Sequence, residues 1–308
     1  MKTKIILDVD PGHDDAVAIL VAAKHEKLDL RGITVVAGNQ VLEKTLQNAL
    51  KVCSFAGIDV PVYAGQDRPL LRDQVIADDI HGDSGLDGPQ FPPPTKRAEE
   101  KSAVDFIIEE CLQHDREIVL VPTGPLTNIA LALLKEPRIK QGIKEIVLMG
   151  GAYGLGNVTP SAEFNIFVDP EAAHIVFESG LPITMVGLDL THQAKAYPEV
   201  VERIRRLGTP VAELVVELFA FFGDTYKRVF GFEAPPLHDV CAVAHVIDPT
   251  LIKTQKVPVV VETTRGACYG RTVCDFYFKT GKPANVHVAM ELDQKRFWDL
   301  VIDTLSKY

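Results

Sequence analysis

Short aliphatic runs alternate with helical patterns along most of the chain, and this alternation is the strongest constraint on the fold. The first run, Lys4–Val9, is stopped by Pro11-Gly12, as expected for a buried strand that ends in a turn. The predicted strands are 4–9, 31–37, 60–64, 117–121, 145–149 and 182–186. The predicted helices between and after them include 16–23, 41–55, 98–114, 198–206, 210–230 and 238–246. Such alternation is typical of an α/β fold with a mostly parallel sheet covered by helices on both faces.

The 308 residues have room for one or two domains. Because we find no linker, repeat or low-complexity tract, we expect a single domain over 1–308. The segment 66–95 interrupts the alternation with three glycines, a run of three prolines and no periodicity. A loop of this length in a compact domain is usually a lid or a binding loop. After residue 253 we expect strands at 257–261, 272–278 and 286–290, and a final helix.

Charge and composition exclude several classes of partner. Acidic residues outnumber basic ones by 42 to 32, which gives a net charge of -10 and disfavours binding to nucleic acid or anionic lipid. The apolar run 16–23 is far shorter than the ~20 residues of a membrane span, and the N-terminus has no signal-peptide pattern, so we expect a cytoplasmic protein. We expect reduced thiols, most of them in the core, and neither zinc ligands nor disulfides, at Cys53, Cys111, Cys241, Cys268 and Cys274.

The segment Asp8-Val-Asp-Pro-Gly-His-Asp-Asp15 holds four carboxylates in eight residues, at the end of a predicted strand. Between Lys4 and Lys24 no Lys or Arg neutralises them. Like charges this close need a cation, and oxygen ligands favour Ca²⁺ or Mg²⁺ over zinc. Alternatively, Asp14 and Asp15 complement a helix dipole and Asp8 caps the strand, which leaves part of the cluster unexplained. We predict a metal site here.

Other polar residues follow the neighbouring strands, at the sheet edge where ligands of open α/β folds bind. Each one alone is more often a turn residue. Together they would form a rim of amides and carboxylates around one crevice, suited to a neutral polyhydroxylated ligand and lacking the features of a phosphate site. These residues are Asn39, Thr123, Asn157, Glu163 and Asn165.

Two histidines have a context that points to chemistry. His238-Asp239 follows Pro235-Pro236-Leu237; Asp239 is either a helix N-cap beside a loop histidine, or the pair supplies an acid and a metal ligand. His81 lies in the 66–95 segment, where a mobile histidine would close over a substrate.

The motifs, in their order along the chain, resemble those of the inosine-uridine nucleoside hydrolase family. The resemblance covers essentially the whole chain and is closest to the bacterial pyrimidine-specific ribonucleoside hydrolases, including Ile80-His-Gly82 and Cys268-Tyr-Gly-Arg-Thr-Val-Cys274. The matching segments are Asp8–Asp15, Pro122-Thr-Gly-Pro-Leu-Thr-Asn128, Met149-Gly-Gly-Ala152, Thr159-Pro-Ser-Ala-Glu-Phe-Asn165 with Asp169-Pro170, and Pro236-Leu-His-Asp239.

The resemblance implies a Rossmann-like domain, a homotetramer and a bound Ca²⁺ ion. The implied metal ligands are the carboxylates of Asp10, Asp15 and Asp239 and the carbonyl of Thr123. The implied substrate contacts are Asp14, Asn39, Met149, Asn157, Glu163, Phe164 and Asn165.

The implied reaction is hydrolysis of the N-glycosidic bond of a ribonucleoside, with no nucleotide cofactor. Asp10 would act as general base on a metal-bound water, and the transition state would resemble an oxocarbenium ion. His238 is the candidate acid for the leaving base, and His81 either assists it or only contacts the base.

Two residues of the helix 210–230 bear on base preference. Tyr226 and Phe230 stand where pyrimidine-specific relatives carry Gln and Tyr. Tyr226 would stack on a purine, serve the leaving group or simply pack in its helix. We expect uridine and cytidine as substrates, with inosine as a further one; a broad or purine-preferring hydrolase is the alternative.

Two other classes fit parts of the sequence. Asp8-x-Asp10 after a strand also suits a haloacid-dehalogenase-like phosphatase, but Pro11-Gly12-His13 follows where that fold normally carries Thr or Ser. A non-catalytic nucleoside-binding protein would not need a carboxylate-rich metal centre.

Overall fold

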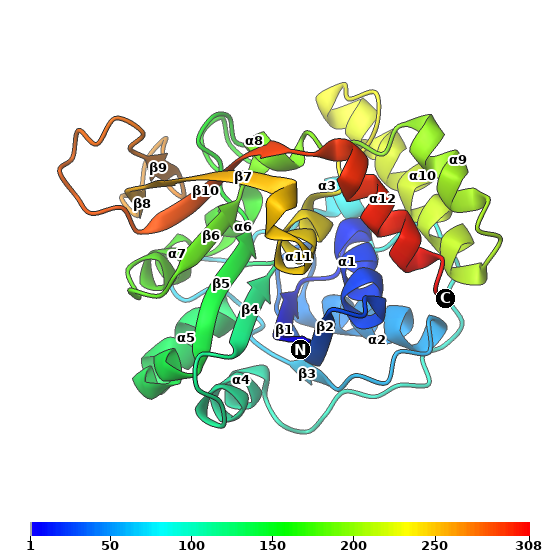
Figure 1. The fold of residues 1–308 in the computed structure, drawn as a ribbon, viewed down its shortest axis with the longest axis horizontal. Coiled ribbons are helices and arrows are strands. Elements are labelled where there is room, and N and C mark those ends of the chain that lie inside the picture. Colours follow the sequence, from blue (N-terminus) through cyan, green and yellow to red (C-terminus); the bar gives the residue numbers. More distant parts are fainter. Residues whose placement is uncertain (1) are drawn as a thin grey trace.

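The computed structural model describes residues 2–308, and an eight-stranded sheet runs through its centre in the order β3-β2-β1-β4-β5-β6-β10-β7 (Figure 1). Every neighbouring pair is parallel except β10 and β7. The prediction of a mostly parallel mixed sheet is therefore confirmed. The strands are β1 Thr3–Val9, β2 Leu28–Val35, β3 Val62–Ala64, β4 Ile118–Pro122, β5 Ile143–Met149, β6 Ile183–Val186, β7 Ile252–Val257 and β10 Val286–Leu292.

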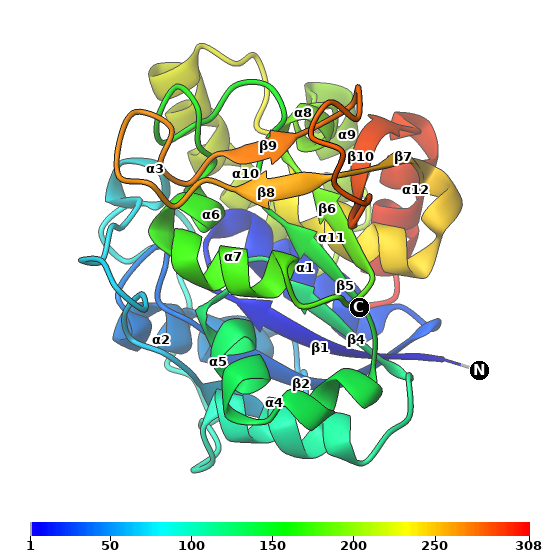
Figure 2. The ribbon, with the colours of Figure 1, turned by 90° about the vertical axis from the view of Figure 1, so that its left-hand side faces the viewer.

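Helices cover both faces of this sheet (Figures 1 and 2). One face carries α1 His13–Lys24, α2 Leu42–Phe55, α11 His238–Ile247 and α12 Gln294–Leu305, with α9 Pro198–Arg205 and α10 Pro210–Phe230 packed outside them. The opposite face carries α4 Ala103–Leu112, α5 Thr127–Lys135 and α7 Pro170–Phe177.

Alternate residues of the central strands supply the two cores. Leu7 of β1 packs with the α1 side, whereas its neighbour Ile6 packs with the α4 side. Val119 and Leu120 of β4 divide in the same way. Because successive side chains of a strand point to opposite faces, a strand buried on both faces must be apolar throughout. This explains why the sequence shows these strands as continuous aliphatic runs.

The strand order indicates where a ligand would bind, at the carboxyl ends of β1, β2 and β4. β1 is flanked by β2 and β4, and the register aligns Asp8 with Thr34 on one side and with Pro122 on the other. The chain segments that follow these three strands therefore leave the sheet at the same level. After β1 the chain moves to β2 and β3 on one side, and it later returns to β4 on the other. Ligands of open α/β sheets bind at such a switch point.

The structure corrects several predicted boundaries. The predicted strand 257–261 is divided between the end of β7 and β8 Val259–Val261, and most of β7 was not predicted. Instead of 272–278, only β9 Thr272–Cys274 is a strand, because the Asp275 carboxylate accepts hydrogen bonds from the amides of Lys279 and Thr280 and turns the chain. β8 and β9 form a separate two-stranded sheet.

Helical predictions also need correction. The predicted helix 98–114 begins only at Ala103, because the Ser102 hydroxyl caps it by accepting from the Asp105 amide. The short helices α3 Asp78–His81, α6 Phe164–Val168 and α8 Leu188–Thr191 were not predicted, since four or five residues are too few to show a helical period. Two 3-10 turns, Pro137–Gln141 and Pro249–Leu251, complete the chain.

The segment 66–95 folds over the carboxyl end of β2. Asn39 accepts a hydrogen bond from the Ala77 amide at 3.0 Å, and the Asn48 side chain donates to the Ser84 carbonyl at 2.9 Å. Its three glycines, Gly82, Gly85 and Gly88, all have positive φ, which other residues adopt only with strain. Among residues 2–308, no helix combines the length and the apolar character needed to cross a membrane.

Two leucines provide a matched test of the packing. Leu120 in β4 is fully buried, whereas the Leu134 side chain in α5 is 57% exposed. Leu120→Ala should lower the free energy of unfolding by about 2–5 kcal/mol through lost burial and a residual cavity. Leu134→Ala should change it by less than about 0.5 kcal/mol. Urea unfolding measures both; similar losses in the two variants would contradict this assignment of the core.

Candidate active site

The turn from β1 into α1 starts the site. Pro11 and Gly12 end the strand, and α1 begins at His13, so Asp14 and Asp15 fall in the first helical turn. The Asp15 Oδ2 atom accepts a hydrogen bond from the Gly12 amide at 3.0 Å. Negative charge at this position is stabilised by the helix dipole and by free backbone amides.

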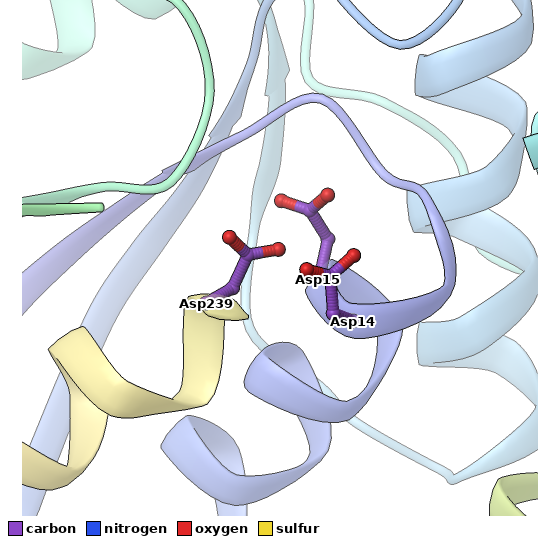
Figure 3. A group of neighbouring side chains, drawn as sticks. All are labelled: Asp14, Asp15 and Asp239. Atoms are coloured by element: carbon purple, nitrogen blue, oxygen red, sulfur yellow. The ribbon is translucent and has the colours of Figure 1, made fainter. Parts of the chain in front are cut away.

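Three carboxylates converge at this point. Asp14 and Asp15 come from α1 and Asp239 from the first turn of α11, and their side chains face one common space (Figure 3). One oxygen of each lies within 4.8 Å of the others, and all three residues are buried. Since α11 begins at His238, Asp239 is not its N-cap, and that alternative is wrong.

Burial and mutual repulsion raise the pKa values of this cluster. Burial, followed by the charge of Asp15, raises the pKa of Asp14 to about 7, and burial raises that of Asp15 to about 6. The pKa of Asp239 lies well above its ordinary value because of burial and of the charges of Asp14, Asp15 and Asp10. The cluster therefore cannot hold its full negative charge at neutral pH unless a cation compensates it. These residues fit a divalent ion that prefers oxygen ligands.

Asp10 lies beside the three clustered carboxylates. Its Oδ2 accepts from the Asn39 amide at 2.7 Å, whereas its Oδ1 is buried without a hydrogen-bond partner. Two glycines pack directly against the Asp10 carboxylate. A Cβ on Gly38 would lie 2.1 Å from Asp10 Oδ2, and a Cβ on Gly124 would lie 2.6 Å from Asp10 Oδ1. Only glycine fits at these two positions. An unpartnered buried carboxylate oxygen is a further sign that the site binds a cation or a polar ligand.

Thr123, which follows β4, connects the cluster to the opposite wall. Its hydroxyl donates to Asp15 Oδ1 at 2.8 Å, and its carbonyl accepts from the Asn165 side chain at 2.6 Å. A carbonyl oxygen has two lone pairs, so one remains for a ligand. Asp8, the remaining carboxylate of the motif, faces away from the cluster, because its Oδ1 accepts hydrogen bonds from the side chains of Thr34 and Asn128.

A cavity of about 180 Å³ opens above these carboxylates. All but two of the predicted site residues line it; Asp10 and Asp15 lie behind the lining. The predicted residues on its wall are Asp14, Asn39, His81, Thr123, Met149, Asn157, Glu163, Phe164, Asn165, Tyr226, Phe230, His238 and Asp239.

Backbone amides organise one side of the cavity. Glu163 caps α6: its Oε1 accepts from the Asn165 amide at 2.9 Å and its Oε2 from the Gly151 amide at 2.8 Å. Burial nevertheless raises the pKa of Glu163 to about 7. The Asn157 Oδ1 accepts from the Phe164 amide at 2.9 Å. This side therefore presents fixed amide and carboxyl groups, as a polyhydroxylated ligand requires.

His238 lies on the other side, with both ring nitrogens engaged. Nδ1 lies 2.7 Å from the Thr191 hydroxyl and Nε2 lies 2.7 Å from the Tyr226 hydroxyl. Burial holds the pKa of His238 well below its ordinary value. Thr191 was not predicted, and no local sequence signal marks it. Tyr226 in turn packs against Phe222 and Phe230 at ring-centroid distances of 4.6 and 5.1 Å.

Phe222 also lines the cavity and was missed by the sequence reasoning. It precedes Tyr226 by four residues, and Phe230 follows by four, so all three lie on one face of α10. This spacing is a signal that could have identified the aromatic wall. Val229 and Ile80 extend the wall and were not predicted either.

His81 is buried and lies on the wall of the same cavity. Its ring stacks on His13 and Phe222 at centroid distances of 5.3 and 5.4 Å. His13, the histidine of the Asp8–Asp15 motif, has no predicted role, although it is fully buried here and lies 3.0 Å from His81 between the Nδ1 atoms.

Comparisons with known proteins agree with this geometry. The model of the inosine-uridine preferring nucleoside hydrolase family matches residues 5–299. The chain is 53% identical over 307 residues to the pyrimidine-specific ribonucleoside hydrolase RihB of Escherichia coli (strain K12 / DH10B), covering 100% of this chain and 98% of that protein.

Solved structures of nucleoside hydrolases also match this chain over nearly its whole length. A purine-preferring ribonucleoside hydrolase from Gardnerella vaginalis matches with a TM-score of 0.92 and 37% identity, covering 98% of each chain. The plant nucleoside hydrolase PpNRh1 matches with a TM-score of 0.92 and 32% identity, covering 99% of each chain.

The fold, the carboxylate cluster and the cavity thus define a hydrolase of small polar molecules. The chain belongs to the inosine-uridine preferring nucleoside hydrolase family, whose members cleave the N-glycosidic bond of ribonucleosides. The predicted enzyme class is confirmed, and neither the phosphatase nor the binding protein describes this chain.

The raised pKa values predict how stability depends on pH in chelated protein. Because the folded pKa values of Asp14 and Asp15, about 7 and 6, exceed the unfolded ones, their contribution is full below about pH 4 and is lost as the pH rises through 6 to 7. The melting temperature should fall between about pH 5 and pH 8, and a divalent cation that binds the cluster should restore it most at the higher pH.

Calorimetry with and without chelator measures this. Asp14→Asn should flatten the pH dependence, whereas substitution of the exposed Asp83 by Asn should not. A chelated protein that is more stable at about pH 8 than at about pH 5 would contradict the assignment.

Proposed function

We propose that the protein is a Ca²⁺-dependent ribonucleoside hydrolase that prefers uridine and cytidine and also accepts inosine. The observation that carries the proposal is the buried cluster of Asp14, Asp15 and Asp239 beneath a cavity with polar groups on one side and aromatic rings on the other. A nucleoside has the same division, with a hydroxylated ribose and a flat base.

Asp15 and Asp239 of this cluster would hold the ion together with Asp10, which lies beside it, and the Thr123 carbonyl, whereas Asp14 would be left to the ribose. The donor set consists of oxygen atoms only, which favours Ca²⁺ over softer metals. When bound, the ion supplies positive charge that offsets the clustered carboxylates and makes a bound water more acidic. Asp10 has the free oxygen that the general base needs, since its Oδ1 has no other partner.

The ribose would lie on the amide-rich side. Asp14, Asn39, Asn157, Glu163 and Asn165 offer carboxylate and amide groups to its hydroxyls, and Met149 and Phe164 pack against its apolar edge. The hydrogen bonds of Glu163 and Asn157 to backbone amides hold these groups in place before the substrate arrives. Such preorganisation reduces the entropy lost on binding.

The chemistry follows from these positions. Water attacks C1′ of the ribose while the bond from C1′ to the base nitrogen breaks, and Asp10 takes the proton of the water. Positive charge develops on the ribose in the oxocarbenium-like transition state, and the carboxylates around it stabilise that charge. The electron pair of the broken bond leaves with the base, which must gain a proton.

We assign the proton donor for the base to His238. It would donate either directly or by way of the Tyr226 hydroxyl, which lies 2.7 Å from its Nε2. Thr191 orients the ring by its contact with Nδ1. His81, on the cavity wall, would contact the base.

The pyrimidine preference is supported by the 53% identity to a pyrimidine-specific relative. The aromatic wall of Phe222, Tyr226 and Phe230 favours the alternative, a purine-preferring or broad enzyme, because large flat bases stack well on it. A solved relative at 37% identity is purine-preferring.

We extend the proposal to the organisation of the protein. The chain would act as one nucleoside hydrolase domain over 1–308, with 66–95 as its active-site loop, since that segment supplies His81 to the cavity wall. Following the family resemblance, we also propose a homotetramer in the cytoplasm.

The first test measures free ribose from uridine, cytidine, inosine and adenosine, with and without chelator. We expect chelator-sensitive release, fastest from the two pyrimidine nucleosides. Asp10→Asn should remain folded and lose at least about a hundredfold in kcat, as is usual for a lost general base. A fastest rate on inosine or adenosine would overturn the preference, and a near-normal kcat of Asp10→Asn would overturn the role of Asp10.

Leaving-group dependence tests His238. His238→Ala should slow uridine hydrolysis by about 10²–10⁴-fold, because the departing uracil then lacks its proton donor. Hydrolysis of p-nitrophenyl riboside, whose leaving group needs no proton, should be slowed much less. Equal losses on both substrates would argue that His238 only maintains the structure.

A further inference from the structure

A second cavity lies behind the aromatic side of the active-site cavity, and the mechanism above does not use it. Its volume is about 470 Å³, against about 180 Å³ for the active-site cavity. Three residues line both spaces, namely Asn157, Tyr226 and Phe230. The two cavities therefore share one wall. The rest of this side cavity is lined by the loop 154–156, by residues 188, 189 and 192 in and after α8, and by Phe232.

The wall of the side cavity is mainly apolar. Leu155 comes from the loop between β5 and α6, Leu188 from the start of α8, and Phe232 from the segment after α10. The Phe232 ring packs edge-on against His192 at a centroid distance of 5.1 Å. Apolar and aromatic walls of this kind favour a neutral apolar or aromatic group over water.

Asp189 adds a carboxylate to this wall, but one of its oxygens is already occupied. Its Oδ2 accepts hydrogen bonds from the amides of Tyr153 and Gly154 at 2.8 and 3.3 Å. The carboxylate is thus held by the backbone of the loop that carries Leu155, and the loop keeps its place beside α8. The side cavity is therefore a built space between fixed elements.

Tyr226 and Phe230 separate the two cavities, and they are held in different ways. Tyr226 is buried, and its hydroxyl lies 2.7 Å from His238 Nε2. Phe230 is half-buried, has no hydrogen-bonding group, and packs against the rings of Tyr226 and Phe232 at 5.1 and 6.0 Å. It is also the last residue of α10, before Gly231, and helix ends fray. Phe230 is therefore the part of the shared wall that can rotate without breaking a hydrogen bond.

We propose that the side cavity extends the base site and receives an apolar or aromatic substituent of the base once the Phe230 ring has rotated. The inference rests on the proposed function, in which the carboxylate cluster holds the ribose and the base lies on the aromatic side. The edge of the base remote from the sugar then points toward the shared wall. The additional substrates are pyrimidine ribonucleosides with a bulky neutral group on the base, such as N4-benzoylcytidine.

The two volumes support this placement. The active-site cavity has less than half the volume of the side cavity, so a nucleoside that fills it leaves a phenyl-sized group to be placed elsewhere. The side cavity offers that space directly behind Phe230, and burial of the group against Leu155, Leu188 and Phe232 favours binding.

Methyl NMR locates the substituent without any turnover. The variant Asp10→Asn, labelled at its Leu and Met methyl groups, is titrated in Ca²⁺ with cytidine and with N4-benzoylcytidine. Met149 reports on the active-site cavity, Leu155 and Leu188 report on the side cavity, and the exposed Leu134 of α5 is the control. Both nucleosides should shift the Met149 signal. Only N4-benzoylcytidine should shift both leucines of the side cavity, through the ring current of its benzoyl group, and neither should shift Leu134.

The possible failures are distinguishable in the same spectra. A shift of Met149 with N4-benzoylcytidine but none of Leu155 and Leu188 would overturn the side-cavity proposal and leave the proposed function intact. No shift of Met149 with cytidine would refute ribonucleoside binding at this site, and the side-cavity proposal would fall with it.

Kinetics with matched variants test the consequence for the substrate. Leu155 is 79% exposed and does not line the active-site cavity, so Leu155→Trp should fill part of the side cavity without touching the catalytic groups. Its kcat/KM for N4-benzoylcytidine should fall about tenfold or more, while cytidine is hydrolysed at nearly the native rate. Leu155→Ala, which enlarges the side cavity, and Leu134→Trp, which lies on the opposite face of the sheet, should not show this loss. An equal loss on both substrates in Leu155→Trp would assign Leu155 a purely structural role.

Phe230→Ala tests the movable wall. Removing this ring should raise the ratio of kcat/KM for N4-benzoylcytidine to that for cytidine, because the substituent no longer needs to displace it. A lower ratio than in the native protein would contradict the assignment. If Leu155→Trp does not fold, this ratio and the methyl spectra still decide the question. A native protein that hydrolyses cytidine but neither binds nor hydrolyses N4-benzoylcytidine would overturn the proposal.

Discussion

The mutual repulsion of buried carboxylates is the constraint on which the rest of this structure depends. Asp14, Asp15 and Asp239 are brought within 4.8 Å of one another in a site from which water is largely excluded. Two structural features reduce the electrostatic penalty. All three lie in the first turns of helices, where the helix dipole is positive, and Asp15 accepts from the Gly12 amide and the Thr123 hydroxyl. The remaining imbalance is what a bound cation would remove.

The sheet order makes this concentration of charge possible. β1 lies between β2 and β4, so Asp10, Asn39 and Thr123 leave three adjacent strands at one level. Close approach of the backbone then requires glycine at positions 38 and 124, where any Cβ would collide with Asp10. The parallel topology therefore determines the position of the cluster, and the glycines make room for it.

The central strands and the carboxylate cluster could be predicted from the sequence because the patterns that mark them are local. Aliphatic runs mark strands buried on both faces, and four carboxylates in eight residues mark the site. The sequence predicted poorly what depends on contacts between distant segments. The Thr191 hydroxyl meets His238 across 47 residues, and His13 meets His81 across 68, and neither pair has a spacing that sequence periodicity can show. The short helix α6 was missed for another reason, since its five residues are too few to show a helical period.

The two sides of the cavity are therefore built by different means. The side around Glu163 and Asn157 is fixed by backbone amides next to the carboxylate cluster, so few substitutions there would leave this arrangement intact. The aromatic side is built by side chains of α10 and of the 66–95 segment, which lie outside the sheet edge. Replacing Tyr226 or Phe230 would change this aromatic wall without altering a group of the cluster. The aromatic wall can thus vary within one fold while the carboxylate cluster is preserved, and this chain matches both a pyrimidine-specific and a purine-preferring hydrolase.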